Sequence, residues 1–104
     1  MTAILYLVLA IFFEVAGTTS MKLSNGFTEL YPSFFIFIFY FFSFGFLTLS
    51  LKRLELSTAY AIWSGLGTLL IALIGMFFFK ESMTMIKALS LGLIICGVMG
   101  LRLG

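Results

Sequence analysis

Glu14 is the strongest candidate in this chain for a chemical role, because it is an acid inside a long apolar segment. The sequence has 104 residues, of which four are acidic. Glu29, Glu55 and Glu81 fall in polar stretches, whereas Glu14 lies in the apolar run 3–21. If that run is a helix across a bilayer, Glu14 is about 3 Å from its midpoint at 1.5 Å per residue. An ionised carboxylate at that depth costs several kcal/mol, so it needs a partner.

The sequence offers this carboxyl group no internal counter-ion. All six Lys and Arg residues lie in polar stretches or at the ends of apolar runs. Glu14 is therefore either protonated, because desolvation favours the neutral acid, or paired with a cation from outside the chain. A proton and a cation would then compete for one carboxylate, and a site open alternately to each side of the membrane would exchange them. The structural alternative is a protonated bridge between helices, worth about 0.6 to 2 kcal/mol.

Three aromatic side chains are placed to assist such a cation site. Tyr40 lies near the middle of the second apolar run, and Tyr60 and Trp63, the only tryptophan, lie in the first third of the next run. Ring faces attract organic cations by about 0.5 to 2 kcal/mol each, which predicts an aromatic box for a delocalised cation. Tyr and Trp also anchor helices at membrane interfaces, and periodicity alone leaves both interpretations open. We expect no metal site and no cofactor, because the chain has no His and one Cys.

Small residues in the later runs indicate bends or close helix contacts. Gly65 and Gly67 lie in the third apolar run, where they predict either a hinge or a packing notch. Ser90 and Gly97 are seven residues apart in the fourth run and predict a helix–helix seam. Four helices enclose little space by themselves, so we expect two copies to assemble.

The composition is that of a membrane protein. Apolar residues make up 62% of the chain and charged residues 10%, against about 25% charged residues in soluble domains. Lipid offers the backbone no hydrogen-bond partner, so the runs must be helices. We therefore expect one all-α integral membrane domain over residues 1–104. The expected transmembrane helices cover about residues 3–21, 31–51, 57–79 and 85–103.

Enzymatic and nucleic-acid functions find no support in the sequence. The common catalytic motifs are absent, so the chain is not expected to be an enzyme. The net charge is only +2 and the basic residues are scattered, which argues against a nucleic-acid partner.

Lysine and arginine, whose excess normally marks the cytoplasmic side, are divided equally between the two sides of the expected helices. The side with both termini and the second loop carries Lys52, Arg53 and Arg102. The other side carries Lys22, Lys80 and Lys87. Either another factor, such as a partner, orients the chain, or the chain inserts both ways round.

The sequence resembles the small multidrug resistance transporters along nearly the whole chain. The resemblance is carried by residues 14–19 (EVAGTT), by Met21-Lys22 and by residues 25–28 (NGFT). Its most specific block is residues 60–67 (YAIWSGLG). Lys80-Glu81 and Gly97-Val98 add support.

The resemblance implies an antiparallel, dual-topology homodimer of four-helix subunits. It also implies that Glu14 of both subunits forms one shared site that binds protons and substrate. The substrate-binding side chains that it implies are Tyr60, Trp63, Tyr40, Thr18 and Ser43. The family often has glycine where this chain has Ser90, and serine is still small enough for the seam.

The resemblance further implies a proton-coupled antiporter of lipophilic, aromatic and quaternary ammonium cations, in several passes across a bacterial inner membrane. The guanidinium-exporting branch typically carries Trp shortly after the first-helix Glu, whereas this chain has Ala16-Gly17-Thr18-Thr19. The alternatives are a guanidinium or polyamine exporter, as a heteromeric pair in some relatives, and a small membrane subunit that does not transport.

Overall fold

The chain forms four long helices joined by short connections, in a computed structural model that describes residues 2–104. The helices are α1 (Thr2–Leu23), α2 (Leu30–Ser50), α3 (Leu56–Phe78) and α4 (Met85–Leu103). Each is long and apolar enough to cross a membrane. Their bounds differ from the predicted ones by no more than two residues. No strand occurs within residues 2–104, so the described chain is all-helical.

The helix ends next to the polar connections contain residues that favour turns and helix starts. Between α1 and α2 the backbone turns through Asn25, Gly26 and Phe27, which all have positive φ values. Asn and Gly adopt such left-handed conformations more readily than other residues, so Asn25-Gly26 suits this turn. Pro32 lies in the first turn of α2, where its missing N–H costs no hydrogen bond. At the start of α4, the Thr84 side chain accepts a hydrogen bond from the Lys87 N–H at 3.1 Å.

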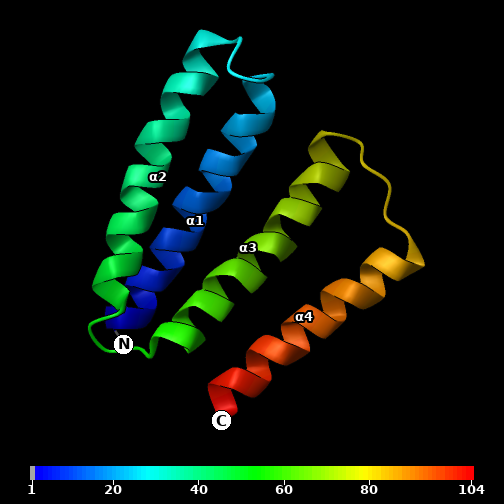
Figure 1. Ribbon diagram of the computed structural model, residues 1–104. Coiled ribbons are helices and arrows are strands. Elements are labelled where there is room, and N and C mark those ends of the chain that lie inside the picture. The colour runs from blue at the N-terminus through cyan, green and yellow to red at the C-terminus, as the bar shows by residue number, and fades with distance from the viewer. Residues whose placement is uncertain (1) are drawn as a thin grey trace.

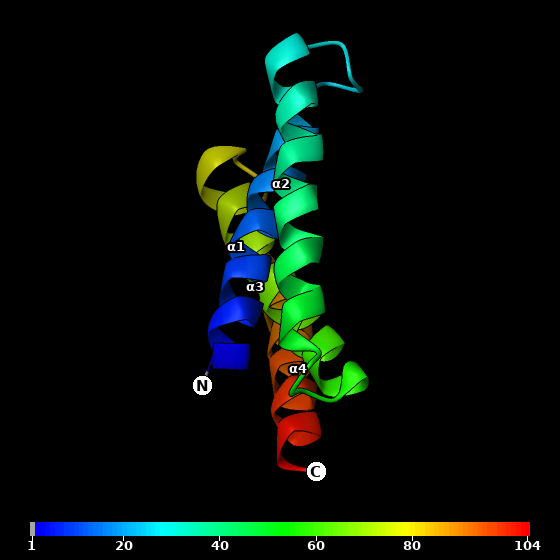
Figure 2. The ribbon, with the colours of Figure 1, turned by 90° about the vertical axis from the view of Figure 1, so that its left-hand side faces the viewer.

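The helices lie side by side in a flat body, with sequential helices antiparallel (Figure 1). Helix α1 lies between α2 and α3, and α4 packs at the edge, mainly against α3. The view turned by 90° shows the thin dimension of this body (Figure 2). Its Cα atoms span 42 × 35 × 17 Å. A body this thin has two broad faces and encloses little interior.

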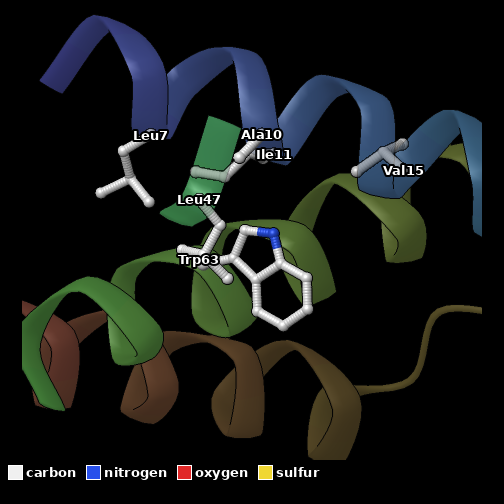
Figure 3. Close-up of a cluster of buried hydrophobic side chains, with 6 residues drawn as sticks. All are labelled: Leu7, Ala10, Ile11, Val15, Leu47 and Trp63. Carbon is white, nitrogen blue, oxygen red and sulfur yellow. The ribbon is translucent and has the colours of Figure 1, made fainter. Parts of the chain in front are cut away.

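The buried core lies where α1, α2 and α3 meet, and Trp63 is its largest side chain (Figure 3). The other members of this cluster are Leu7, Ala10, Ile11, Val15 and Leu47. In lipid, helices gain little from hiding apolar groups, so close packing of such side chains supplies the attraction. The core therefore fixes three of the four helices relative to one another.

Helix α4 is held differently, because none of its residues is buried. At Gly65 of α3, a Cβ atom would lie 2.6 Å from Val98 Cγ2 of α4. That distance is too short for two carbon atoms, so α4 reaches this position only because residue 65 is glycine. One glycine notch thus sets the spacing of α3 and α4.

Candidate functional site

Glu14 lies on α1, half-buried, with its carboxylate directed at α3. One oxygen, Oε1, accepts a hydrogen bond from Thr18 Oγ1 at 3.1 Å, one helical turn along α1. The other oxygen, Oε2, is buried and has no hydrogen-bond partner within the described chain. A buried polar atom in that condition is costly unless a ligand or a proton satisfies it.

Gly67 makes room for this carboxylate on α3. A Cβ atom at position 67 would lie 2.8 Å from Glu14 Oε2, closer than the two atoms can pack. The absence of a side chain therefore brings the α3 backbone against the unpartnered oxygen. No sequence pattern linked Gly67 to Glu14, because the contact joins two helices.

A chain of hydroxyl groups connects Glu14 to α2. The Thr18 hydroxyl, which donates to Glu14, also hydrogen-bonds the Tyr40 hydroxyl. Tyr40 can reach α1 because Gly17 leaves space there, and a Cβ at position 17 would lie 2.7 Å from the Tyr40 ring. Two predicted site residues, Thr18 and Tyr40, are thus joined to Glu14.

The predicted aromatic residues form one row that runs from α2 to α3. The ring centroids of Tyr40 and Phe44 are 5.8 Å apart, as are those of Phe44 and Trp63. Tyr60 follows at 5.3 Å from Trp63. Phe44 was missed from the sequence, although it lies four residues after Tyr40 and so shares its helix face. The row is continuous only because Phe44 bridges the two helices.

Trp63 packs in the buried core, and its indole N–H is a hydrogen-bond donor that the described chain does not use. The residue is buried, and its Nε1 has no hydrogen-bond partner within the described chain. In Figure 3 the ring nitrogen is on the side of the indole that faces α1. Tyr60, by contrast, is exposed. The row therefore passes through the core at Trp63 and reaches the surface at Tyr60.

Ser43 lies apart from this row. It is fully buried, and its hydroxyl donates to the Ala10 carbonyl at 2.7 Å. Ala10 is one turn before Glu14 on α1, so in this structure Ser43 joins α2 to the backbone of α1 beneath the carboxyl group.

The predicted hinge and seam residues lie in regular helices. Helix α3 runs unbroken through Gly65 and Gly67, where each glycine admits a neighbouring side chain. Ser90 and Gly97 are exposed on α4, and a Cβ at position 97 would meet nothing within 4 Å. The small-residue stripe of α4 is therefore open within the single chain.

A cavity of about 180 Å³ lies beside the hydroxyl chain, between α1 and the end of α3. Its polar lining consists of Thr18, Thr19, Lys22 and Glu81. The Thr19 hydroxyl is buried without a hydrogen-bond partner. Thr18 and Lys22 continue the four-residue spacing that starts at Glu14, which was a usable sequence signal. Glu81 comes from the α3–α4 connection, and no local pattern could have placed it.

A metal centre is not suggested by the described residues. Over residues 2–104, no three His, Cys, Asp or Glu side chains gather closely enough to hold an ion. Cys96 is a free, exposed cysteine on α4.

Comparison with known proteins identifies the family of this chain. The family described as Small Multidrug Resistance protein matches residues 2–94. Multidrug resistance protein EbrB of Bacillus subtilis (strain 168) is 45% identical over 98% of this chain and 87% of its own length. Quaternary ammonium compound-resistance protein QacG of a Staphylococcus strain is 40% identical over 90% of this chain and 88% of its own.

The chain is also similar to a protein that is named for a different substrate. The guanidinium exporter of Yersinia pestis is 38% identical over 93% of both chains. The relatives therefore include proteins named for multidrug resistance, for resistance to quaternary ammonium compounds and for guanidinium export. The family match covers most of the chain, from the start of α1 to the middle of α4. This chain is a multi-pass bacterial membrane protein of the small multidrug resistance family of transporters.

Proposed function

We propose that this protein exports lipophilic, aromatic and quaternary ammonium cations across the bacterial inner membrane in exchange for protons. The observation that carries the proposal is Glu14 Oε2, a buried carboxylate oxygen without a hydrogen-bond partner. Such an oxygen takes either a proton or a cation. The relatives named for multidrug resistance and for resistance to quaternary ammonium compounds support this substrate class.

In this proposal the two oxygens of Glu14 have different roles in the exchange. Thr18 holds Oε1 by a donated hydrogen bond, and Tyr40 in turn holds Thr18. Oε2 is then left as the position where a proton or a cation binds, beside the Gly67 backbone. Because both cannot neutralise the same oxygen, binding of substrate displaces the proton, and the linkage is reciprocal.

The aromatic row fits a cation that cannot donate hydrogen bonds. A quaternary ammonium group has no N–H, so charge and ring faces must recognise it. Tyr40, Phe44, Trp63 and Tyr60 form a row of rings on the α2 and α3 side of Glu14. Substrates with aromatic groups would gain further contact there. We assign Ser43 a place at the edge of this site, bracing α2 against α1.

The site is completed, in this proposal, by a second copy in an antiparallel homodimer. Helix α4 has no buried residue and presents Ser90 and Gly97 as an open small-residue stripe. The equal division of lysine and arginine supports insertion in both orientations. Two Glu14 carboxyls in one site would titrate as a coupled pair. Gly65 and Gly67 would absorb the bending of α3 as the site changes the side to which it opens.

The test is transport by the purified protein in liposomes. With a proton gradient imposed, the wild-type protein should accumulate tetraphenylphosphonium, and Glu14→Gln should abolish the uptake. Glu29→Gln is the matched control, because Glu29 is an exposed acid before α2 and should leave uptake unchanged. Uptake that survives Glu14→Gln removes Glu14 from the mechanism. A leak that needs no proton exchange, or no transport at all, would indicate a small membrane subunit of another kind.

Guanidinium or polyamine export is the second candidate, since the Glu14 carboxylate could also accept hydrogen bonds from N–H donors. The guanidinium exporter of Yersinia pestis supports it, whereas the stretch Ala16-Gly17-Thr18-Thr19 lacks a tryptophan. Competition of guanidinium, spermidine and tetraphenylphosphonium for one site decides between the two. Preference for guanidinium or spermidine would overturn the multidrug assignment, and a requirement for a second gene product would indicate a heteromeric pair.

A further inference from the structure

Two cavities at the end of the molecule that holds the α2–α3 connection meet at Arg102. One has a volume of about 520 Å³, is largely polar and is lined by Thr2, Ala3, Ile4, Arg53, Leu54 and Arg102. The other has a volume of about 350 Å³ and is an apolar groove between α3 and α4. We propose that the two cavities together bind one anionic phospholipid, with its phosphate at the arginines and an acyl chain in the groove.

The polar cavity has the charge that a lipid phosphate requires. Arg53, from the α2–α3 connection, and Arg102, from the last turn of α4, both line it. No carboxylate lines it, although Glu55 lies only two residues from Arg53. Guanidinium groups bind phosphate oxygens in pairs and keep their charge at any physiological pH. One arginine from the α2–α3 connection and one from α4 therefore line the same uncompensated site.

The groove offers an apolar surface, which an acyl chain could contact and a soluble phosphate could not. Besides Arg102 it is lined only by apolar side chains: Ile62, Leu66, Ile95, Val98, Met99 and Leu103. From Ile95 to Arg102 it follows α4 for about 10 Å at 1.5 Å per residue. It thus runs from the arginine at the membrane surface toward the bilayer interior, as an acyl chain does. Basic pockets between transmembrane helices are suited to anionic head groups.

The groove is also separate from the proposed dimer seam. At 100° per residue, Ile95 and Arg102 point about 160° and about 140° away from Gly97 around the helix axis. A partner packed on Ser90 and Gly97 would therefore leave the groove open to lipid. The site lies at the opposite end of α3 from the cavity that Glu81 lines, and its occupancy does not depend on the transport proposal.

Native mass spectrometry of the detergent-solubilised protein tests this inference. The probes are phosphatidylglycerol and phosphatidylcholine with identical acyl chains, mixed in equal amounts. The wild-type protein should retain phosphatidylglycerol preferentially, and replacing Arg53 and Arg102 by Gln should lower the preference by about fivefold for each arginine. The matched control is Lys52→Gln with Lys80→Gln, which removes the same charge outside the cavity and should leave the preference unchanged.

Two further measurements test the groove and the arginines separately. Met99→Trp fills the groove without touching the arginines, so it should weaken retention of phosphatidylglycerol. Glycerol phosphate, which has the head group alone, should not displace the lipid. Equal retention of both lipids overturns the inference, as does an equal loss in the lysine control. Displacement by glycerol phosphate would assign the arginines to a soluble anion, and dissociation of the dimer by the arginine variants would assign the groove to a second copy.

Discussion

Glu14 differs from an ordinary buried acid because its two oxygens have unequal surroundings. Thr18 satisfies Oε1, whereas Oε2 lies buried and unpartnered against Gly67. The sequence was sufficient to select Glu14, since its depth in an apolar run could be counted. It was not sufficient to separate the two oxygens, which requires the rotation of α3 relative to α1.

The pH dependence of substrate binding follows from competition at this carboxyl group. Tetraphenylphosphonium affinity should fall as pH falls, because protons occupy the site, and should level off once Glu14 is fully ionised. The fall is expected to reach about tenfold per pH unit for each proton displaced. Equilibrium binding measured from about pH 5 to about pH 9 checks it, with Glu14→Gln as the reference. A flat wild-type profile would contradict shared use of the site.

Gly67→Ala should move the carboxylate, since the new methyl group would overlap Glu14 Oε2. We expect the Kd for tetraphenylphosphonium to rise about tenfold or more, equivalent to about 1.4 kcal/mol. Gly45→Ala on α2 is the matched control, because a Cβ there meets nothing within 4 Å. The control should bind normally and be slightly more stable, as alanine favours helix over glycine. Unchanged binding by Gly67→Ala would show that close approach of α3 is not needed.

At the scale of the helices, the spans could be predicted to within two residues because apolar runs alternate with short polar connections. Their mutual packing could not be predicted in the same way. Lipid accepts apolar side chains on every side of a helix, so hydrophobic periodicity does not reveal which face meets a neighbour. For this reason the sequence did not place Phe44 beside Trp63, or Glu81 in the cavity with Thr18.

The α3–α4 contact should depend on the absence of a side chain at Gly65. Gly65→Ala brings a methyl group against Val98, whose branched side chain has little freedom to rotate away. We expect a loss of about 1 to 3 kcal/mol in the free energy of unfolding. Adding Val98→Ala should recover most of it. Denaturant titration in mixed micelles measures both variants.

Gly100→Ala is the control for that measurement, since a Cβ at position 100 meets no atom within 4 Å. It should be as stable as the wild-type protein or more so. If Gly65→Ala were equally harmless, α4 would be free to shift along α3 and the notch would have no structural role.

For the whole molecule, flatness is the main constraint on function. A body whose thin dimension is 17 Å leaves Glu14 half-buried, with only one layer of helices around it. A single chain therefore cannot surround a substrate, which is why the proposed function needs a second copy. The equal charge count predicts how two copies of one chain could face opposite ways.

Equal insertion in both orientations can be measured by cysteine labelling. In a Cys96→Ala background, Ser82→Cys in the α3–α4 connection should be accessible from outside in about half of the molecules. Replacing Lys80 and Lys87 by Gln leaves a basic excess on the side of the termini, so the labelled fraction should rise toward completion. Wild-type labelling confined to one side would contradict dual topology.

The unequal helix lengths carry a consequence for the surrounding bilayer. Helix α3 has 23 residues and α4 has 19, so at 1.5 Å per residue they are about 34 Å and about 28 Å long. In a hydrocarbon layer of about 30 Å, the longer α3 spans with more tilt than α4 needs. Thicker membranes would draw α3 upright and thinner ones would tilt it further, and Gly67 moves with it. The acyl-chain length of the surrounding lipids should therefore change the position of Gly67 relative to the Glu14 carboxylate, independently of proton or substrate concentration.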